Sequence, residues 1–481
     1  MRYPPTPRLD IGMLDEHDRS AAADGMPSPA SASGGARLAR LAALLAVLLI
    51  AACSSFRPTM IPAAHDVSAL PSGPTPVHQP VVVVVTLSGG GARASAFGLG
   101  VLRELKATEF TWDMEPTTLL DQVTLISGVS GGSLLAAHFA AFGDESLTRF
   151  ETDFLLRDFQ GRLIELALSP LRLFRLSSPW YGRTDVLAER LEELYRGRTF
   201  GDLRARSRGP DLLVTATDLT TGAPFEFTPE QFRLICADWA SVPLSFAVAA
   251  SSAVPLLLTP VTVPNNAGTC EATAQAVPTG GEDNYRTRLL RSTVESYLNP
   301  EERPYIHLVD GGLADNLGMR TIMDRLIVEG SISAGFQRTA PGSIRKVVFI
   351  AVNSERGLVE DIDQNDRIPT SRQVVEALLF GAGARLTRTT LGMMEDDVQR
   401  WRLEMEAVRG TPGSPFAADA ELHFVTVSLG EVQDRELRRT LLAVPTAFTI
   451  DTDQVRELVN AGREVLRQSP EFQRLQRSLG P

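Results

Sequence analysis

One serine stands between glycines after an apolar run, in the turn at residues 128–132, whose sequence is GVSGG. The run before it, residues 123–127, predicts a buried strand, and residues 133–142 predict a helix. A G-x-S-x-G turn between a strand and a helix exposes the serine oxygen at a sharp bend. The free N–H groups at the start of that helix stabilise negative charge on the oxygen. We therefore predict that Ser130 is a nucleophile rather than one more small residue in a tight turn.

A serine hydroxyl is a poor nucleophile without a base, and the sequence leaves two arrangements open. In the first, Asp310 acts alone: it ends an apolar strand predicted at 305–312, so that it and Ser130 can meet at the carboxyl edge of one sheet. In the second, His423 joins them in a triad with the chain order used by α/β-hydrolases. His423 stands at the start of a predicted strand rather than in a loop after one, which favours a surface or core histidine.

A glycine-rich stretch follows the continuously apolar strand predicted at 81–87. Acyl transfer through a tetrahedral intermediate needs backbone N–H groups directed at the oxyanion. Gly89, Gly90 and Gly91 can turn such donors outward, and Arg93 either adds positive charge or holds the loop in place. We therefore expect this stretch to form an oxyanion hole.

The same stretch has a competing interpretation from another class of protein. Gly89, Gly91 and Ala94 match the G-x-G-x-x-G/A pattern of dinucleotide-binding loops, which lies between a strand and a helix. That motif requires a second strand ending in Asp or Glu about 20 residues further on. The sequence near that distance, residues 107–116, does not look like such a strand end, so nucleotide binding is disfavoured.

Strands alternate with helices along the chain, which predicts an α/β fold with a mostly parallel sheet in one domain. Helical sequence fills residues 145–205, and residues 261–300 look like an irregular, polar insertion. The remaining strands are predicted at 211–219, 225–228, 346–353 and 423–429. A formal charge of −11 over 481 residues argues against nucleic-acid binding, which needs a surplus of Lys and Arg.

The first 52 residues are expected to lie outside the fold, as a disordered leader and a signal peptide. An apolar run at 41–52 follows two arginines and ends at Cys53, in a sequence that resembles a bacterial lipobox, where the cysteine is lipidated. Ser54 rather than Asp after this cysteine favours the outer membrane, so we expect a lipid-anchored protein of the bacterial cell envelope. Cys236 and Cys270 would then be left over, compatible with one disulfide or with two free thiols.

Three pieces of the chain, taken together and in this order, resemble the patatin-like phospholipase family. They are Ser88-Gly89-Gly90-Gly91-Ala92-Arg93, Gly128-Val129-Ser130-Gly131-Gly132 and Asp310-Gly311-Gly312. Residues 215–227 and 249–261 are also similar to blocks of that family. The chain departs from the family pattern at Ser88, where Asp is common, and at Ala94, where Gly is common, but neither change removes a backbone donor.

The resemblance implies a three-layer α/β/α sandwich and a Ser-Asp dyad, with no catalytic histidine, metal or nucleotide. Carried over, Ser130 is the nucleophile, Asp310 its base, and Gly131 joins the glycine loop in the oxyanion hole. The implied activity is hydrolysis of phospholipid or lysophospholipid esters. A general esterase or thioesterase with a Ser-His-Asp triad, and a lipid-binding lipoprotein without catalysis, are the alternatives.

These expectations divide the chain into four parts. Residues 1–52 are the leader and signal peptide, and 53–80 are a Pro- and Ser-rich linker. Residues 81–325 are the patatin-like catalytic core, and 326–481 complete the same domain with added helices.

Overall fold

The structure is a computed structural model. It describes residues 55–58, 60–64, 78–112, 114–206, 209–270, 284–328, 330–336, 339–355, 366–370, 373–374, 377 and 382–480. The expected leader at 1–52 and the expected lipidation site Cys53 lie outside these residues. Of the helices in the described ranges, none is both long enough and apolar enough to cross a bilayer.

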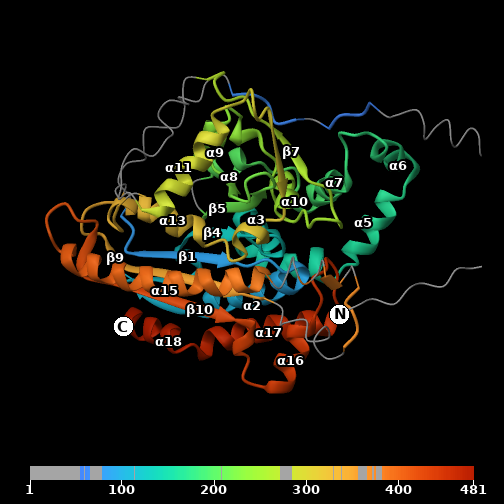
Figure 1. Cartoon of the computed structure of the whole chain (residues 1–481). Helices are drawn as coiled ribbons and strands as arrows, with labels where there is room; N and C mark the ends of the chain where they lie inside the picture. Colours follow the sequence, from blue (N-terminus) through green and yellow to red (C-terminus); the bar gives the residue numbers. More distant parts are fainter. Residues whose placement is uncertain are drawn as a thin grey trace, which may run out of the picture. The chain divides into compact units, whose positions relative to one another are not determined.

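A sheet of eight strands forms the centre of the domain (Figure 1). Seven strands follow the order β10 (Phe416–Ser428), β9 (Ile344–Asn353), β1 (Val81–Leu87), β4 (Val123–Gly128), β5 (Asp211–Asp218), β8 (Tyr305–Val309) and β7 (Val261–Pro264), and β6 (Pro224–Glu226) pairs with β5. The pairs from β10 to β5 are parallel, and those of β6, β7 and β8 are antiparallel. The predicted mostly parallel sheet is confirmed, with antiparallel strands on one side of it.

Both faces of the sheet are buried, which explains why β1 is apolar at nearly every position. Val81, Val83 and Val85 face one apolar core, while Val82 and Val84 face a second core. Helices α2 (Gly91–Ala107), α3 (Gly131–Phe142), α7 (Arg183–Tyr195), α10 (Leu244–Ser251), α17 (Thr452–Gln468) and α18 (Pro470–Leu479) contribute to the first core. Helices α13 (Arg320–Val328) and α15 (Ala382–Val408) contribute to the second. The fold is therefore the predicted three-layer α/β/α sandwich.

The remaining elements surround these layers. They are the hairpin β2 (Glu109–Trp112) and β3 (Glu115–Thr118), and the helices α4 (Ser146–Phe150), α5 (Phe159–Ala167), α6 (Pro170–Leu176), α8 (Phe200–Arg204), α9 (Pro229–Leu234), α11 (Tyr285–Tyr297), α12 (Gly312–Asp315) and α16 (Arg435–Ala443). The prediction of an irregular insertion at 261–300 is wrong at both ends, where β7 and α11 form. Part of the predicted linker also packs on the domain, since Ala63 forms a β-bridge with Ala237.

Helix α17, the last but one in the chain, packs against α2 with direct backbone contact. A Cβ added to Gly462 would lie 2.1 Å from the carbonyl oxygen of Phe97, and one added to Gly100 would lie 2.0 Å from that of Val459. Each helix therefore presents a glycine to the backbone of the other, and α2 begins at the glycine loop. The C-terminal part of the chain thus supports the element that carries the candidate oxyanion donors.

We predict that Gly462→Ala lowers the free energy of unfolding by about 1–3 kcal/mol, because the added methyl group forces the two helices apart. The measurement is urea unfolding followed by circular dichroism. Gly392→Ala is the matched control: Gly392 is exposed on α15 with open space around it, so alanine should stabilise that helix by up to about 1 kcal/mol. Equal effects of the two changes would contradict the close packing of α2 and α17.

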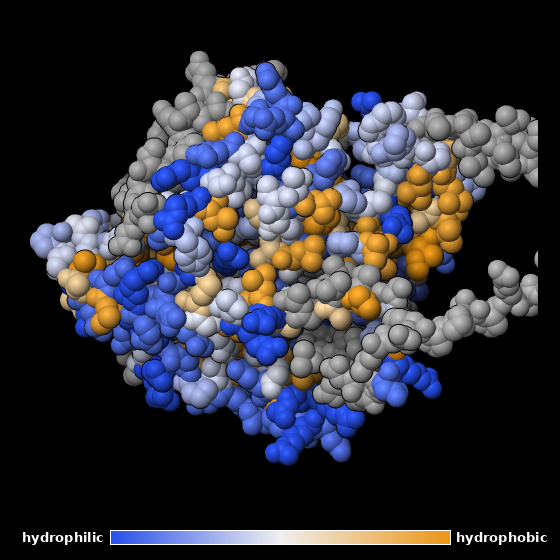
Figure 2. All heavy atoms as spheres, in the orientation of Figure 1, coloured by the Kyte–Doolittle hydropathy of each residue, from blue (hydrophilic) through white to orange (hydrophobic). Residues whose placement is uncertain are grey.

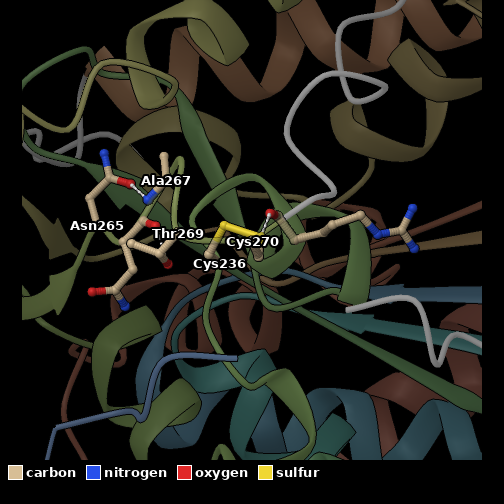
Figure 3. Close-up of a disulfide and its surroundings, with 7 residues drawn as sticks. Cys236, Asn265, Ala267, Thr269 and Cys270 are labelled. Atoms are coloured by element: carbon tan, nitrogen blue, oxygen red, sulfur yellow. Dashed lines mark hydrogen bonds between the residues drawn. A yellow bond between two sulfur atoms is a disulfide. The ribbon is translucent and has the colours of Figure 1, made fainter. Parts of the chain in front are cut away.

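A disulfide joins Cys236 to Cys270 (Figure 3). The turn before Cys270 is held by its own hydrogen bonds, in which Ala267 N–H donates to Asn265 Oδ1 (3.2 Å) and Thr269 Oγ1 donates to Asn266 O (2.7 Å). Asn266 N–H also donates to Ile235 O (3.0 Å), which places the turn beside Cys236. The bridge thereby ties the loop after β7 to the segment after α9.

Replacing both cysteines by serine should lower the free energy of unfolding by about 4 kcal/mol, since the bridge closes a loop with a sequence separation of 34 residues. Urea unfolding under non-reducing conditions measures this loss. Cys53→Ser, the control, should leave the unfolding midpoint unchanged. An unchanged midpoint for the double variant would contradict the disulfide.

Candidate active site

Ser130 lies in a strained turn between β4 and α3. Its backbone has φ 48° and ψ −121°, a combination that costs about 1–3 kcal/mol and persists only where the surroundings enforce it. Val129 N–H donates to Leu87 O (3.1 Å), and a Cβ on Gly132 would lie 2.2 Å from that same oxygen. The end of β1 and Gly132, the second glycine after the serine, therefore fix the sharp bend predicted from the G-x-S-x-G sequence.

The hydroxyl of Ser130 donates a hydrogen bond to Asp310 Oδ2 at 2.7 Å. The other carboxylate oxygen of Asp310 accepts the N–H of Gly312 at 2.8 Å. Both residues are buried, with 7% and 8% of their surface exposed. Burial raises the pKa of Asp310 to about 6, although the bonds from Ser130 and Gly312 act in the opposite direction. Asp310 therefore lies in hydrogen-bond contact with the Ser130 hydroxyl, and burial makes it a stronger base than an exposed carboxylate.

The route by which Asp310 reaches Ser130 differs from the expected one. The prediction that β4 and β8 end at the same edge of a parallel sheet is wrong, because β8 runs antiparallel to β5. Val214 of β5 pairs with Gly128, the last residue of β4. Strand β5 continues for four residues beyond Val214, and β8 runs back along this extension. A Cβ on Gly311 would lie 2.1 Å from Thr215 O, so glycine is required for this approach.

Ser251 is a site residue that the sequence did not reveal. It ends α10, and its hydroxyl accepts the N–H of Ser130 (2.8 Å) while donating to Thr215 O (2.6 Å). Two residues later, Ala253 O accepts the N–H of Asp310 (3.0 Å). One short segment therefore holds the backbone of both Ser130 and Asp310. Its only signal in the sequence is the similarity of residues 249–261 to a family block.

Among the described residues, the loop formed by Gly89, Gly90 and Gly91 has two backbone N–H groups without an acceptor, not three. The N–H of Gly89 donates to Asn316 O (3.0 Å), so Gly89 cannot serve an oxyanion and its predicted role is corrected. Within the described part of the chain, the N–H groups of Gly90 and Gly91 have no acceptor, and neither has that of Gly131 at the start of α3. Gly91 has φ +61°, and a Cβ on Gly131 would lie 2.2 Å from Gly91 N. The N-termini of α2 and α3 therefore meet at these glycines.

Arg93 holds the glycine loop. Its side chain is buried, and its guanidinium donates to Ser354 O (3.0 Å) after β9, to Val444 O, and to Thr446 Oγ1 (3.4 Å). Ala447, which follows Thr446 in the chain, accepts the N–H of Ala92 (2.7 Å). Of the two roles predicted for Arg93, holding the loop accounts for these contacts.

His423 lies far from this constellation. In the parallel register it is level with Val348 of β9, which is level with Val83 of β1 and hence with Val123, the first residue of β4. Ser130 follows the last residue of β4. His423 therefore lies three strands away from it, beside the start of β4 and not its end. The His423 ring contacts Glu471 and Glu421, both at 3.3 Å, and burial lowers its pKa despite these carboxylates. The structure therefore does not bring the triad together.

Among the described residues, no three His, Cys, Asp or Glu side chains form a group that could hold a metal ion.

The sequence matches the family model described as Patatin-like phospholipase over residues 85–323. No protein with a curated description matches it. Solved structures with similarity include human GIVD cytosolic phospholipase A2, with 14% identity and a TM-score of 0.40 over 84% of this chain and 62% of that chain. VipD from Legionella pneumophila has 11% identity and a TM-score of 0.29 over 88% and 71% of the two chains. The type III effector ExoU has 19% identity and a TM-score of 0.20 over 52% and 60%.

These structural likenesses are remote, and the chain spans less than two thirds of the length of the human enzyme structure. The assignment rests on the family model, whose match contains the glycine loop, the serine turn and the Asp-Gly-Gly sequence. This chain therefore belongs to the patatin-like phospholipase family through a domain that spans residues 85–323.

Proposed function

We propose that this protein hydrolyses ester bonds of phospholipids or lysophospholipids through a Ser130–Asp310 dyad and an acyl-enzyme. Membership of the family supports a lipid hydrolase. The single observation that carries the proposed mechanism is the 2.7 Å hydrogen bond from the hydroxyl of Ser130 to a buried carboxylate, beside three backbone N–H groups without acceptors. A nucleophile, a base and oxyanion donors are the parts that acyl transfer requires.

In the first step, Oγ of Ser130 attacks the ester carbonyl while Asp310 accepts the hydroxyl proton. The carbonyl oxygen becomes an oxyanion, which the N–H groups of Gly90, Gly91 and Gly131 stabilise. The alcohol then leaves with the proton from Asp310, and the acyl group stays on Ser130. Water, deprotonated by Asp310, hydrolyses this ester and restores the serine.

A carboxylate with a pKa of about 6 is still a weak base for a hydroxyl, so it cannot account for the rate alone. The N-termini of α2 and α3 supply the remaining stabilisation, because their dipoles and free donors favour negative charge at the reacting atoms. The proposed mechanism therefore depends as much on the contact between Gly91 and Gly131 as on the dyad.

We also propose that the enzyme is anchored to the bacterial envelope, in the outer membrane, by a lipid on Cys53. The support is the arginine-flanked apolar run that ends at this cysteine and the serine that follows it. A lipid anchor and a lipid substrate would place the enzyme on the surface that contains its substrate. A Ser-His-Asp esterase is disfavoured by the position of His423, and the intact dyad argues against a lipoprotein without catalysis.

Three variants of the full chain test the dyad on p-nitrophenyl butyrate and on a labelled phospholipid. We expect Ser130→Ala and Asp310→Asn each to lower kcat by at least about 1,000-fold, since the first removes the nucleophile and the second removes its base. His423→Ala, the control, should keep kcat within about twofold, because its ring bonds to Glu421 and Glu471 and lies three strands away from Ser130. A folded but inactive His423→Ala variant would instead support the triad. Wild-type protein without turnover on any ester would support the non-catalytic alternative.

The pH dependence tests the role of Asp310 as the base. Its carboxyl must be ionised to accept the proton, and its pKa is raised to about 6, so kcat/KM should fall about tenfold per unit below that pH. Above that value the rate should reach a plateau. Asp315 is the matched control, because burial also raises its pKa to about 6. Within the described residues its carboxylate accepts backbone N–H groups, those of Leu317 and Arg320, and not a serine hydroxyl. Asp315→Asn should keep the acidic limb, and losing the limb in that variant would contradict the assignment.

A further inference from the structure

A band of large apolar side chains is exposed on α5, α6 and the loop after α10. Figure 2 shows hydrophobic residues gathered where α5 and α6 lie in Figure 1. This apolar surface consists of Leu156, Ile164, Leu168, Leu171, Leu173, Phe174, Trp180, Leu256 and Leu257, which are 41–69% exposed. Exposed apolar groups in such number mark a surface that another molecule covers.

The apolar side chains face outward because other residues hold the helices to the domain. On its inner side α5 buries Phe159 and Leu163. Arg172 (3.0 Å) and Arg175 (3.4 Å) of α6 both bond to Glu189 of α7. The outward face therefore results from a fixed arrangement of α5 and α6, not from a segment without contacts.

Both ends of this region are tied to segments that run from the candidate active site. At its start, Gln160 bonds to Phe448 (3.2 Å) and Thr449 (2.9 Å). These two residues directly follow Ala447, whose carbonyl accepts the N–H of Ala92 next to the glycine loop. At its end, the guanidinium of Arg183 donates to Leu256 O (2.9 Å). Leu256 lies three residues after Ala253, whose carbonyl holds Asp310. Two chain segments therefore connect the apolar surface to the candidate active site.

The charge of the same region differs in sign from that of the chain. Residues 156–183 contain five arginines and two acidic residues, Asp158 and Glu165, which gives +3 in a chain of net charge −11. Arg162 and Arg183 are exposed, and neither forms an ion pair within the described residues. Apolar side chains beside arginines, with a tryptophan among them, suit the interface between acyl chains and anionic headgroups.

We propose that this apolar surface docks the enzyme on an anionic lipid surface, with Leu168, Leu171 and Trp180 entering the acyl region. The proposal rests on the proposed function, since it assigns how that site reaches an aggregated substrate. Residues just after Cys53 approach the same place: Phe56 O accepts the hydroxyl of Ser178 (2.6 Å). Three residues span at most about 10 Å, so a lipid on Cys53 would be attached close to this surface.

The test compares the double variant Leu168→Asp/Leu171→Asp with Leu289→Asp/Leu403→Asp in the full chain. The four leucines are similarly exposed, at 62%, 56%, 52% and 68%, so neither pair should disturb the fold. Every protein also carries Cys53→Ser, so that no lipid anchor contributes. Hydrolysis is measured on phospholipid vesicles that contain about one third phosphatidylglycerol and on soluble p-nitrophenyl butyrate. We expect the first variant to lose at least about tenfold on vesicles and to keep its rate on the soluble ester, while the second keeps both.

A readout of binding that does not require catalysis uses Ser130→Ala versions of the same proteins. Brominated acyl chains in those vesicles should quench the fluorescence of Trp180. The Trp180 signal is the part of the total tryptophan fluorescence that the Trp180→Phe variant lacks. Leu168→Asp/Leu171→Asp should abolish this quenching, and salt should weaken it. Quenching without turnover on any ester would refute the proposed function alone. Vesicle turnover and quenching equal to wild type in Leu168→Asp/Leu171→Asp would overturn the docking proposal. So would a wild type that vesicles do not quench, which would favour a protein partner.

Discussion

The site depends on one backbone conformation, that of Ser130, which an isolated chain would avoid. At φ 48° and ψ −121° the residue bends sharply from β4 into α3. Its hydroxyl bonds to Asp310, and α3 begins at the next residue, Gly131. The surrounding structure enforces the conformation through Leu87 O and the hydroxyl of Ser251, which accept the N–H groups of Val129 and Ser130. Strain at this position is therefore balanced by the packing of the sheet and of α10.

The glycines are explained by the same constraint. The backbone of Gly131 touches Gly91, and that of Gly132 touches the end of β1, so no side chain fits at either position. Two helix N-termini can therefore meet at one point, where their unpaired N–H groups favour a negatively charged oxygen. Arg93 and the segment after α16 hold this arrangement from outside, which connects the C-terminal part of the chain to the glycine loop.

Much of the fold could be predicted from the sequence because its signals are local. The continuous Val run of β1 indicated burial on both faces, and the serine turn followed from glycines between a strand and a helix. The direction of β8 could not be predicted, since strand pairing depends on contacts between distant segments, and Asp310 meets Ser130 through the extension of β5. The roles of Gly89 and Ser251 also depend on distant partners, Asn316 and Ser130. Glycine spacing alone could not separate Gly89 from its neighbours.

The most direct test of the central claim is covalent labelling by an alkyl fluorophosphonate, followed by mass spectrometry of the peptides. A serine activated by a base attacks the phosphorus and displaces fluoride, so the adduct identifies the nucleophile. We predict a single adduct on Ser130 that forms in wild type and in His423→Ala but not in Asp310→Asn. An adduct on another serine, or equally rapid labelling of Ser130 in Asp310→Asn, would contradict the Ser130–Asp310 dyad.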